Sequence, residues 1–342
     1  MDLSIEAPRQ LVSRQSTASA SLSPGEVLVR VNRISLCGSD YRLYEGTYGG
    51  PKNYPIHFGH EWAGHVIEAP RGSRFSPGDR VTGDCSKWCG GCEACEWDKN
   101  ICRNIQKFGI TVDGFSMSVR AVNEKYLYAD ALGLQSELLA LTELFAVARH
   151  GVRAAESRLG RDTAVLVVGS GAVGLATYLI LRRGLGLDNV FLAEAKQAKI
   201  ASVRGRIADC QFAENLPTGP WDRAFTYPEI TSAAKYPVVF ECSGGSGALN
   251  TALMTCAMGG LVICLGLNPV CSVRTDLIVT KRLAIRGSIG GTGEFESAMQ
   301  FLAEHRDSAA ALITHEFAAA EARAAFEQTL DCTDRIKTQL VF

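Results

Sequence analysis

The order of hydrophobic and polar positions changes partway along the chain. Up to about residue 140, short runs such as residues 25–36 and 60–69 alternate apolar and polar side chains between turns, a pattern that predicts β-strands. From Ser136 the apolar residues recur at spacings of three and four, which predicts a helix. Strand-like and helix-like runs then alternate to about residue 290, as expected for βαβ units of a parallel sheet.

Two domains are expected from this change. The 342 residues are enough for two hydrophobic cores. Residues 294–330 have the pattern of two amphipathic helices around a short strand, which we expect to rejoin the first domain. We therefore predict a mainly β domain over residues 1–142 and 285–342, and a doubly wound α/β domain over residues 143–284.

Composition narrows the class of partner. Hydrophobic residues make up 46% of the chain and charged residues 21%, and the formal net charge is −1. This is typical of a globular protein without the basic excess that attracts phosphate backbones, so no nucleic-acid partner is expected. The start of the chain has no secretory or transit pattern, and no run has membrane-spanning length; the cytoplasm is the expected compartment, with no membrane contact.

Four cysteines lie within fourteen residues, "CGGCEACEWDKNIC". Two residues separate Cys89 from Cys92 and Cys92 from Cys95, and six separate Cys95 from Cys102. Thiols in the cytoplasm are kept reduced, so a disulfide framework is disfavoured, and overlapping CxxC units do not match a redox pair at a helix start. The spacing favours four thiolates around one structural zinc ion; free surface thiols are the alternative.

A second motif opens the α/β domain. Gly169, Gly171 and Gly174 form a GxGxxG directly after an apolar strand and before a helix. In this context the glycines allow a tight turn, the approach of a pyrophosphate and close packing of helix on strand, which predicts a Rossmann dinucleotide site. Glu194, twenty residues after Gly174, favours NAD over NADP because a carboxylate accepts from ribose hydroxyls and repels a 2′-phosphate. The alternatives are a glycine turn used only for packing and an ordinary solvated acid.

Mixed metal ligands are scattered through the rest of the chain. "SLCGSD" contains Cys37 and Ser39, "HFGHEWAGH" contains His60 and Glu61, and "ALTELFAV" contains Glu143. Cysteine, histidine and carboxylate together suit a catalytic zinc that keeps a position open for water or substrate. Each residue alone has an ordinary structural explanation as a core or helix-start residue.

The chain resembles the zinc-dependent medium-chain dehydrogenases over nearly its whole length, especially the branch of sorbitol and other polyol dehydrogenases. The resemblance is carried by "LCGSD", "GHEWAGHV", "GDRV", the four cysteines, "TELFAV", "GSGAVG", "ECSG" and "ITHEF", in the family's order. It implies a GroES-like β catalytic domain holding both zinc sites beside a Rossmann domain. It also implies hydride transfer between NAD and a secondary alcohol, namely a polyol, cyclitol or aminocyclitol.

The resemblance also implies roles for the mixed ligands. Cys37 and His60 would bind the catalytic zinc, and Glu61 and Glu143 would either bind it directly or hold its water. Glu143 stands where alcohol dehydrogenases with a two-cysteine, one-histidine set have their second cysteine. Ser39 would pass on the alcohol proton.

On the cofactor side, the resemblance implies that Lys199 reaches the adenosine ribose. The backbone at Ala172 and Val173 would meet the pyrophosphate, and Ser243, Leu265, Ser288 and Gly290 would lie near the nicotinamide. A homo-oligomer, dimer or tetramer, is expected.

Two departures from the family pattern stand out. The interval between Cys95 and Cys102 is one residue shorter than is common, and Cys85 is a conceivable substitute ligand for the cage. Arg42 occupies the position where many relatives have a proton-relaying histidine, and a guanidinium cannot relay protons. Arg42 could instead bind substrate or cofactor phosphate, or be a solvated surface charge.

Two other functions compete with the zinc dehydrogenase. They are a zinc-free reductase of the same superfamily and a non-enzymatic NAD-sensing protein. The intact ligand set argues against both. Four aromatic residues, Tyr44, Tyr48, Trp62 and Phe108, could line a site for a hydroxylated ring or could equally pack in the core.

Overall fold

The computed structural model describes residues 1–16, 22–267 and 270–342, which form two compact units. Unit 1 comprises Met1–Ala146 and Gly290–Phe342, and unit 2 comprises Val147–Ile289. The first division lies inside helix α4 (Thr142–Arg153), whose continuous helical pattern gives no sign of a boundary. The sequence pattern predicted divisions after residues 142 and 284.

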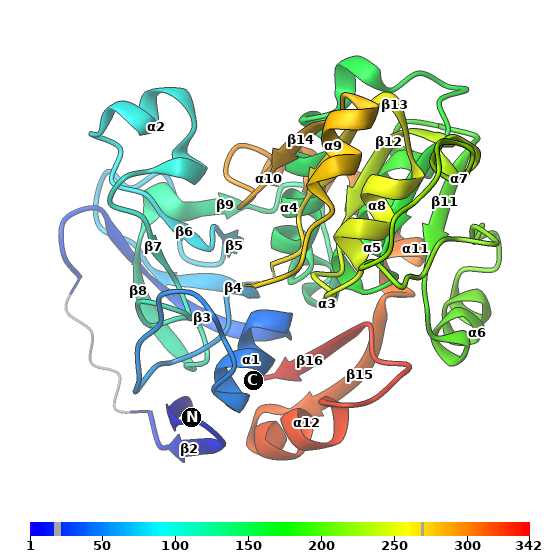
Figure 1. Ribbon diagram of the computed structural model, residues 1–342. Coiled ribbons are helices and arrows are strands. Elements are labelled where there is room, and N and C mark those ends of the chain that lie inside the picture. The colour runs from blue at the N-terminus through cyan, green and yellow to red at the C-terminus, as the bar shows by residue number, and fades with distance from the viewer. Residues whose placement is uncertain (17–21, 268–269) are drawn as a thin grey trace. The chain divides into compact units, whose positions relative to one another are not determined.

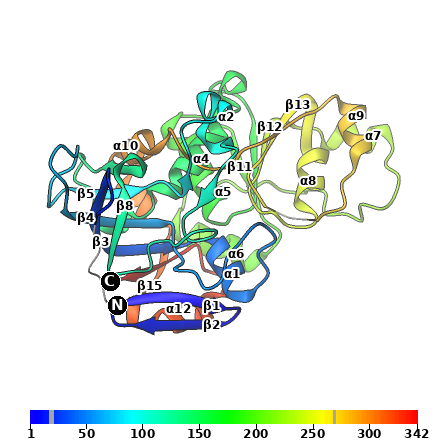
Figure 2. The ribbon, with the colours of Figure 1, turned by 90° about the vertical axis from the view of Figure 1, so that its left-hand side faces the viewer.

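Unit 1 is built around a mixed, mainly antiparallel sheet in the order β15-β16-β3-β4-β5-β9, with β8 also paired to β3 (Figure 2). The bounds of these strands are β3 (Glu26–Leu36), β4 (Glu61–Glu68), β5 (Arg80–Gly83), β8 (Val119–Asn123), β9 (Leu127–Ala129), β15 (Ile313–Ala318) and β16 (Lys337–Val341). The alternation in β3 buries Val27, Val29 and Val31 on one face. β15 and β16 pair in parallel, whereas β16, β4 and β8 pair antiparallel with β3.

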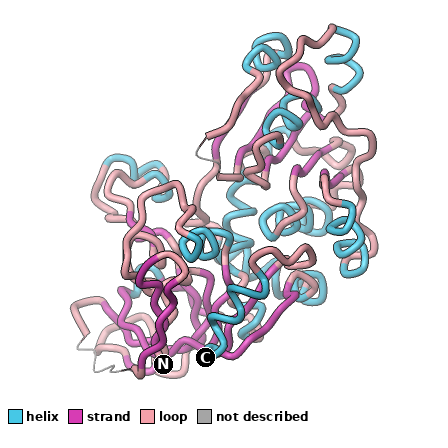
Figure 3. The backbone as a smooth tube through the Cα atoms, turned by 60° about the horizontal axis from the view of Figure 1, so that its bottom comes forward, coloured by secondary structure: helices cyan, strands magenta, loops and turns pink. Residues whose placement is uncertain are grey.

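Smaller elements surround this sheet. They are the hairpin β1 (Asp2–Ala7) and β2 (Gln10–Arg14), the pair β6 (Ser86–Lys87) and β7 (Gln106–Lys107), and helices α1 (Gly38–Glu45), α2 (Glu93–Trp97), α3 (Ser136–Leu139), α10 (Phe295–Glu304), α11 (Arg306–Ala310) and α12 (Ala322–Thr329). Both chain termini lie on the same side of this unit (Figures 1 and 3). The last strand of the chain, β16, pairs antiparallel with β3 and so becomes part of the sheet of unit 1.

Aromatic rings fill the core of unit 1. Phe326 stacks on Tyr44 with ring centroids 4.7 Å apart, and Trp62 stacks on Phe115 at 4.1 Å. Phe108 is buried in the same core. These side chains pack rather than line an open site, whereas Tyr48 is only half-buried.

Unit 2 has a parallel five-stranded sheet in the order β11-β10-β12-β13-β14, namely β10 (Val165–Val168), β11 (Val190–Ala193), β12 (Tyr236–Glu241), β13 (Cys256–Cys264) and β14 (Ala284–Gly287). A parallel bridge between Leu192 and Phe212 adds a short extended segment beside β11. The resulting order is the 3-2-1-4-5-6 arrangement of the Rossmann fold. The predicted fold class, a doubly wound parallel sheet with a mainly β domain, is confirmed.

Helices connect these parallel strands (Figure 1). They are α5 (Ala172–Leu179), α6 (Gln197–Arg206), α7 (Tyr227–Ala233), α8 (Ala248–Thr255) and α9 (Thr275–Lys281). The apolar runs that predicted strands form buried strands such as β10, where all four residues are buried. Among the described residues, no helix combines the length and apolar character needed to cross a membrane.

Candidate functional site

The four clustered cysteines converge in one loop of unit 1, around helix α2. The sulfurs of Cys92 and Cys95 lie 3.5 Å apart, as do those of Cys102 and Cys89, and the Cys92–Cys102 and Cys89–Cys95 pairs are 3.9 Å apart. Four thiolates bound tetrahedrally at the usual zinc–sulfur distance lie roughly 3.8 Å apart. The arrangement therefore fits one ion, and the six-residue interval is long enough to bring in Cys102.

Backbone amides already favour thiolate in this cage. Hydrogen bonding from the backbone of Gly91 lowers the pKa of Cys89 to about 6, and the backbone of Arg103 lowers the pKa of Cys92. Burial has the opposite effect on Cys95 and raises its pKa to about 11. Part of the negative charge that a zinc ion needs is thus prepared by the loop itself.

A second group of ligands lies in unit 1 and comes from separate segments; Cys37 is half-buried and the others are buried. Cys37 precedes helix α1, His60 and Glu61 stand at the start of β4, and Glu143 lies in the first turn of α4. Donor atoms of Cys37, His60 and Glu61 lie within 4.8 Å of one another, and so do donor atoms of His60, Glu143 and Cys85. We call these five residues the mixed cluster. Four of them were predicted from the sequence for this site, and Cys85 was not.

Burial dominates the electrostatics of the mixed cluster. It raises the pKa of Cys37 to about 11, with a further contribution from Glu61, and it raises the pKa of Glu143 to about 8. Without a metal ion, burial therefore favours the protonated form of both groups. A divalent cation bound here would reverse that preference, because it replaces the lost hydration with direct positive charge.

Lys337 at the start of β16 supplies a buried positive charge that was not predicted from the sequence. Its Nζ donates to Glu61 Oε1 at 2.5 Å. Burial alone would lower the pKa of Lys337, but the negative charge of Glu61 and Cys37 outweighs burial, and the pKa stands above its ordinary value. A lysine at a buried position of a short strand suggests that its charge is paired. The sequence alone does not show which residue is the partner, because that depends on the strands beside it.

Asp40 fixes the other side of the cluster. Its carboxylate accepts from the backbone N–H groups of Cys37 at 2.8 Å and Gly59 at 3.1 Å, and its Oδ1 lies 3.8 Å from Nδ1 of His60. Burial raises the pKa of Asp40. A carboxylate beside a ligating histidine sets the orientation and basicity of the imidazole.

The residues present fit a metal ion. His60 and Glu61 are buried, at 3% and 1% exposed, and Glu61 Oε2 has no hydrogen-bond partner within the described residues. Buried polar atoms without partners are costly and usually indicate a bound ion or water. Ser39, with a buried Oγ, stands two residues after Cys37 on the first turn of α1, and Arg42 is half-buried on the same helix.

A third set of metal-ligand types, His315, Cys332 and Asp334, lies at the surface of unit 1. Cys332 Sγ donates to Asp334 Oδ1 at 2.6 Å, and this hydrogen bond raises the pKa of Cys332. The thiol is therefore engaged as a donor, which does not favour metal binding.

The GxGxxG turn of unit 2 has the geometry that a dinucleotide site requires. Gly169 has φ +101°, and a Cβ on Gly174 would lie 1.9 Å from the carbonyl oxygen of Gly169. A Cβ on Gly171 would meet nothing within 4 Å, so this face of the turn is open. Ala172 and Val173, both half-buried, then begin helix α5. The turn thus offers a helix N-terminus and an accessible backbone to an anion.

Glu194 ends β11 beside this turn. Its Oε2 accepts from Ser170 Oγ at 2.7 Å, and its Oε1 accepts from the N–H groups of Ala195 at 2.9 Å and Lys196 at 3.0 Å. These bonds fix a carboxylate next to the glycine turn, as the NAD prediction requires. Lys199 lies on α6 and is largely buried.

Three of the residues predicted near the nicotinamide follow successive strands of the sheet. Ser243 comes after β12, Leu265 after β13 and Ser288 after β14, so all three stand at the carboxyl edge that also holds Gly169. A Cβ on Gly169 would lie 2.7 Å from the Cβ of Ser243, and Ser288 Oγ lies 2.9 Å from His150 Nδ1.

Gly290 belongs to unit 1, where a Cβ would lie 2.2 Å from Asn100 Oδ1. A larger side chain at position 290 would therefore clash with Asn100, and the place of Gly290 near the nicotinamide stays a prediction.

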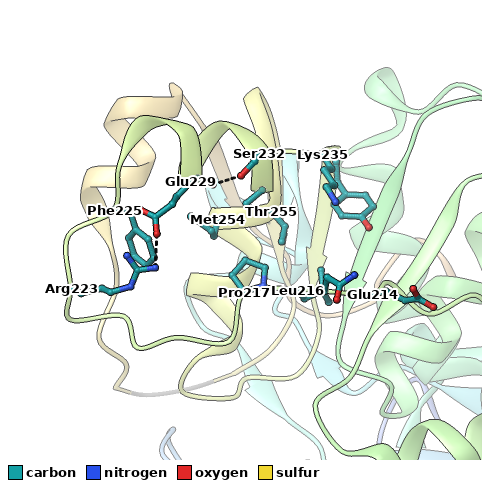
Figure 4. Close-up of a pocket in the computed structure, with 13 residues that line it drawn as sticks. Glu214, Leu216, Pro217, Arg223, Phe225, Glu229, Ser232, Lys235, Met254 and Thr255 are labelled. Atoms are coloured by element: carbon teal, nitrogen blue, oxygen red, sulfur yellow. Dashed lines mark hydrogen bonds and ion pairs between the residues drawn. The ribbon is translucent and has the colours of Figure 1, made fainter.

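A separate cavity of about 420 Å³ lies in unit 2 near the start of β12, at Lys235 and Tyr236 (Figure 4). Arg223 points toward Glu229 there, with an ion pair at 2.8 Å. Dinucleotides bind at the carboxyl edge of such sheets, which is the opposite edge, so this cavity is not the predicted cofactor site.

Comparisons with known proteins agree with these features. The chain matches the alcohol dehydrogenase GroES-like domain over residues 23–131 and the zinc-binding dehydrogenase domain over residues 172–304. It is 28% identical over 315 residues to the sorbitol dehydrogenase of Halalkalibacterium halodurans, covering 87% of each chain.

Two solved structures share the fold. One, from Escherichia coli CFT073, is described as a short-chain alcohol dehydrogenase with NADH; the TM-score is 0.85 at 23% identity, covering 100% of this chain and 98% of the other. The other, from Sinorhizobium meliloti 1021, is assigned as a zinc-binding dehydrogenase with NADP; the TM-score is 0.83 at 24% identity, covering 100% and 98%. With both domain matches in order along the chain, and the cysteine cage, mixed cluster and glycine turn in place, the chain belongs to the zinc-type medium-chain dehydrogenase family.

Proposed function

We propose that this protein is a zinc-dependent oxidoreductase that transfers hydride between NAD and a secondary alcohol of the polyol, cyclitol or aminocyclitol class. The observation that carries the proposal is the mixed cluster, in which Cys37, His60 and Glu61 bring three different donor types together in a buried place. Such a set suits a catalytic zinc with an open position rather than a closed structural site. The relative from H. halodurans is a sorbitol dehydrogenase, which supports the polyol class.

In this proposal Cys37 and His60 hold the ion, and Glu61 and Glu143 either complete its ligands or hold its water. Bound zinc would supply Lewis acidity, lowering the pKa of a bound alcohol as it lowers that of water, and NAD would accept the hydride. The protein's own groups set up the site. Asp40 orients His60, and Lys337 offsets the carboxylate charge of Glu61.

Ser39 is the residue we assign to proton transfer. Its Oγ is buried on the first turn of α1, two residues from Cys37, where a hydroxyl can accept the alcohol proton and donate its own. Arg42, further along the same helix, cannot take part in the relay because its guanidinium stays protonated. We assign it to binding substrate.

NAD is the proposed cofactor rather than NADP. The support is Glu194, which holds a carboxylate at the end of β11 by hydrogen bonds from Ser170, Ala195 and Lys196. A 2′-phosphate at this place would meet negative charge. The four-cysteine cage would hold a second, structural zinc ion, because its short sulfur–sulfur distances match a closed tetrahedral site.

We also propose a homo-oligomer formed through unit 2. All four residues of the edge strand β14 are exposed, and Met258 and Val279 of the same unit are 51% and 77% exposed. An exposed strand edge with neighbouring apolar side chains favours pairing with a second copy. Light scattering after size-exclusion chromatography would report the mass, and a monomer would contradict this part.

The test of the function is turnover on a panel of polyols, cyclitols and aminocyclitols with NAD and NADP compared. We expect oxidation with NAD, its loss when zinc is removed by a chelator, and its recovery on adding zinc back. Glu194→Ala should lower the ratio of kcat/KM with NAD to kcat/KM with NADP. Activity that survives zinc removal would favour the zinc-free reductase, and binding of NAD without turnover of any substrate would favour the sensing protein.

A further inference from the structure

We propose that Cys85 is a direct ligand of the catalytic zinc, so that the mixed cluster supplies two thiolates. Donor atoms of Cys85, His60 and Glu143 lie within 4.8 Å of one another, and the same His60 belongs to the group with Cys37 and Glu61. Cys85 would have no such role without the zinc-dependent activity proposed above, on which the assignment rests. The four sulfurs of the cage form their own group, which does not include Cys85.

The fold holds Cys85 firmly in this place. It lies between β5 and β6 and is 6% exposed. Its carbonyl accepts from the N–H of Phe108 at 3.0 Å, and the neighbouring Asp84 N–H donates to the carbonyl of Tyr126 at 2.8 Å. The N–H of Ser86 donates to Asp84 Oδ1 at 2.8 Å. Backbone on both sides is therefore fixed, as a ligand position requires.

The ligand chemistry supports a second sulfur. Alcohol dehydrogenase zinc is held by two cysteines and one histidine, and this chain has Glu143 where the second cysteine would be expected. A thiol reaching the same histidine from another segment restores that donor set with a different connection through the chain. Soft thiolates are ligands that zinc favours, and a buried cysteine beside a ligating histidine is well placed to become one.

Positive charge is available to balance an additional thiolate. Lys107 Nζ donates to Ser86 Oγ at 2.7 Å, which places an ammonium group one residue from Cys85. On the other side of the cluster, Lys337 donates to Glu61. Both cations lie in unit 1, and together they offset the charge that a second thiolate adds to a buried site.

The experiment replaces zinc with cobalt(II) and measures the near-ultraviolet thiolate-to-cobalt absorption, whose intensity per ion grows with the number of thiolates. His60→Ala should lose the ion of the mixed cluster and keep that of the cage, so subtracting its spectrum isolates the mixed cluster. In Cys85→Ser we expect the isolated band to fall to about half, because one of two thiolates is lost. Cys256→Ser removes a buried cysteine of unit 2 and should match the wild type.

An isolated band of full intensity in Cys85→Ser would overturn the assignment while leaving zinc at His60 in place. Equal spectra and equal metal content in His60→Ala and the wild type would instead overturn the proposed catalytic site itself. Should Cys85→Ser fail to fold, X-ray absorption at the zinc edge of the unmodified protein answers the same question. We expect an average of about three sulfur ligands per zinc, and about two and a half would contradict a role for Cys85.

Discussion

The four-cysteine cage and the mixed cluster lie in the same unit but are assembled in opposite ways. The cage takes its ligands from fourteen consecutive residues around α2, and Cys89 is exposed. The mixed cluster takes its ligands from four separate segments between Cys37 and Glu143, and His60 and Glu61 are almost completely buried. Backbone amides favour thiolate at Cys89 in the cage, whereas burial favours the protonated form of Cys37 and Glu143 in the cluster without metal.

The two arrangements suit the same metal to two purposes, stabilising the fold and acting on substrate. A local loop of four thiolates closes around an ion and stabilises the fold, with no position left for substrate. A buried set of mixed donors leaves one coordination position of the ion open. It also places the ion in a low-dielectric environment, where it acts strongly on a bound oxygen. The two sites should therefore respond differently to the loss of one ligand.

The largest expected effect is on turnover. Cys37→Ala removes a ligand of the proposed catalytic zinc, and we expect activity to fall by about 10³-fold or more, because several kcal/mol of transition-state stabilisation would be lost. The thermal midpoint should change little. Steady-state kinetics with circular dichroism would measure both, and a variant with nearly full activity would contradict the catalytic assignment of the cluster.

Cys92→Ala should lower the thermal midpoint and leave turnover largely unchanged. Loss of the cage ion is expected to cost about 3 kcal/mol of stability, and with an unfolding entropy of about 0.7 kcal/mol/K for a protein of this size that lowers Tm by roughly 4 °C. Activity per folded molecule at low temperature should be largely kept. Calorimetry would test this, and an unchanged Tm together with lost turnover would exchange the roles given to the two sites.

A smaller effect is expected from the residue behind His60. Asp40→Asn keeps the size of the side chain but removes the charge 3.8 Å from His60 Nδ1, and it also loses one of the two hydrogen bonds accepted from the N–H groups of Cys37 and Gly59. Loss of an outer partner of a metal ligand typically weakens metal affinity by about 10–100-fold. Competition with a chromogenic chelator would measure it. Unchanged affinity would mean that Asp40 only supports the backbone of Cys37 and Gly59.

The smallest effect is a difference in pH dependence between the sites. Metal must displace protons from its ligands, so affinity falls as pH falls, and it falls sooner where pKa values are higher. In the metal-free protein the pKa stands at about 11 for Cys37 and also for Cys95 of the cage, but hydrogen bonds lower the pKa of Cys89 to about 6 and also lower that of Cys92, which has no counterpart in the mixed cluster. Between about pH 8 and pH 5 we expect the mixed cluster to release its ion before the cage does. Release in the opposite order in a pH titration of metal content would contradict this comparison.

What the sequence could predict follows the same division. The cage and the glycine turn are local, because Cys89 to Cys102 and Gly169 to Gly174 carry their spacing within a few residues, and both predictions led to compact arrangements. The alternation of strands and helices likewise predicted the Rossmann sheet.

Non-local features were harder. Cys85 was considered as a substitute ligand of the cage because it is close in sequence, yet in the folded chain its sulfur lies within 4.8 Å of ligand atoms of His60 and Glu143. The role of Lys337 depends on a strand that pairs across the sheet with β3, more than 300 residues away. Gly290 was assigned to the cofactor from the family pattern, while its contact with Asn100 depends on a close approach that only the folded chain shows.

The most direct test of the whole account is the zinc content of the wild type, Cys37→Ala and Cys92→Ala, each purified without added metal and analysed by elemental mass spectrometry. We expect about two zinc ions per chain in the wild type and about one in each variant, with turnover lost only where the ion of the mixed cluster is missing. A wild type with one ion per chain, or a Cys37→Ala variant that keeps both ions, would contradict the claim that this protein uses one zinc for its fold and another for its chemistry.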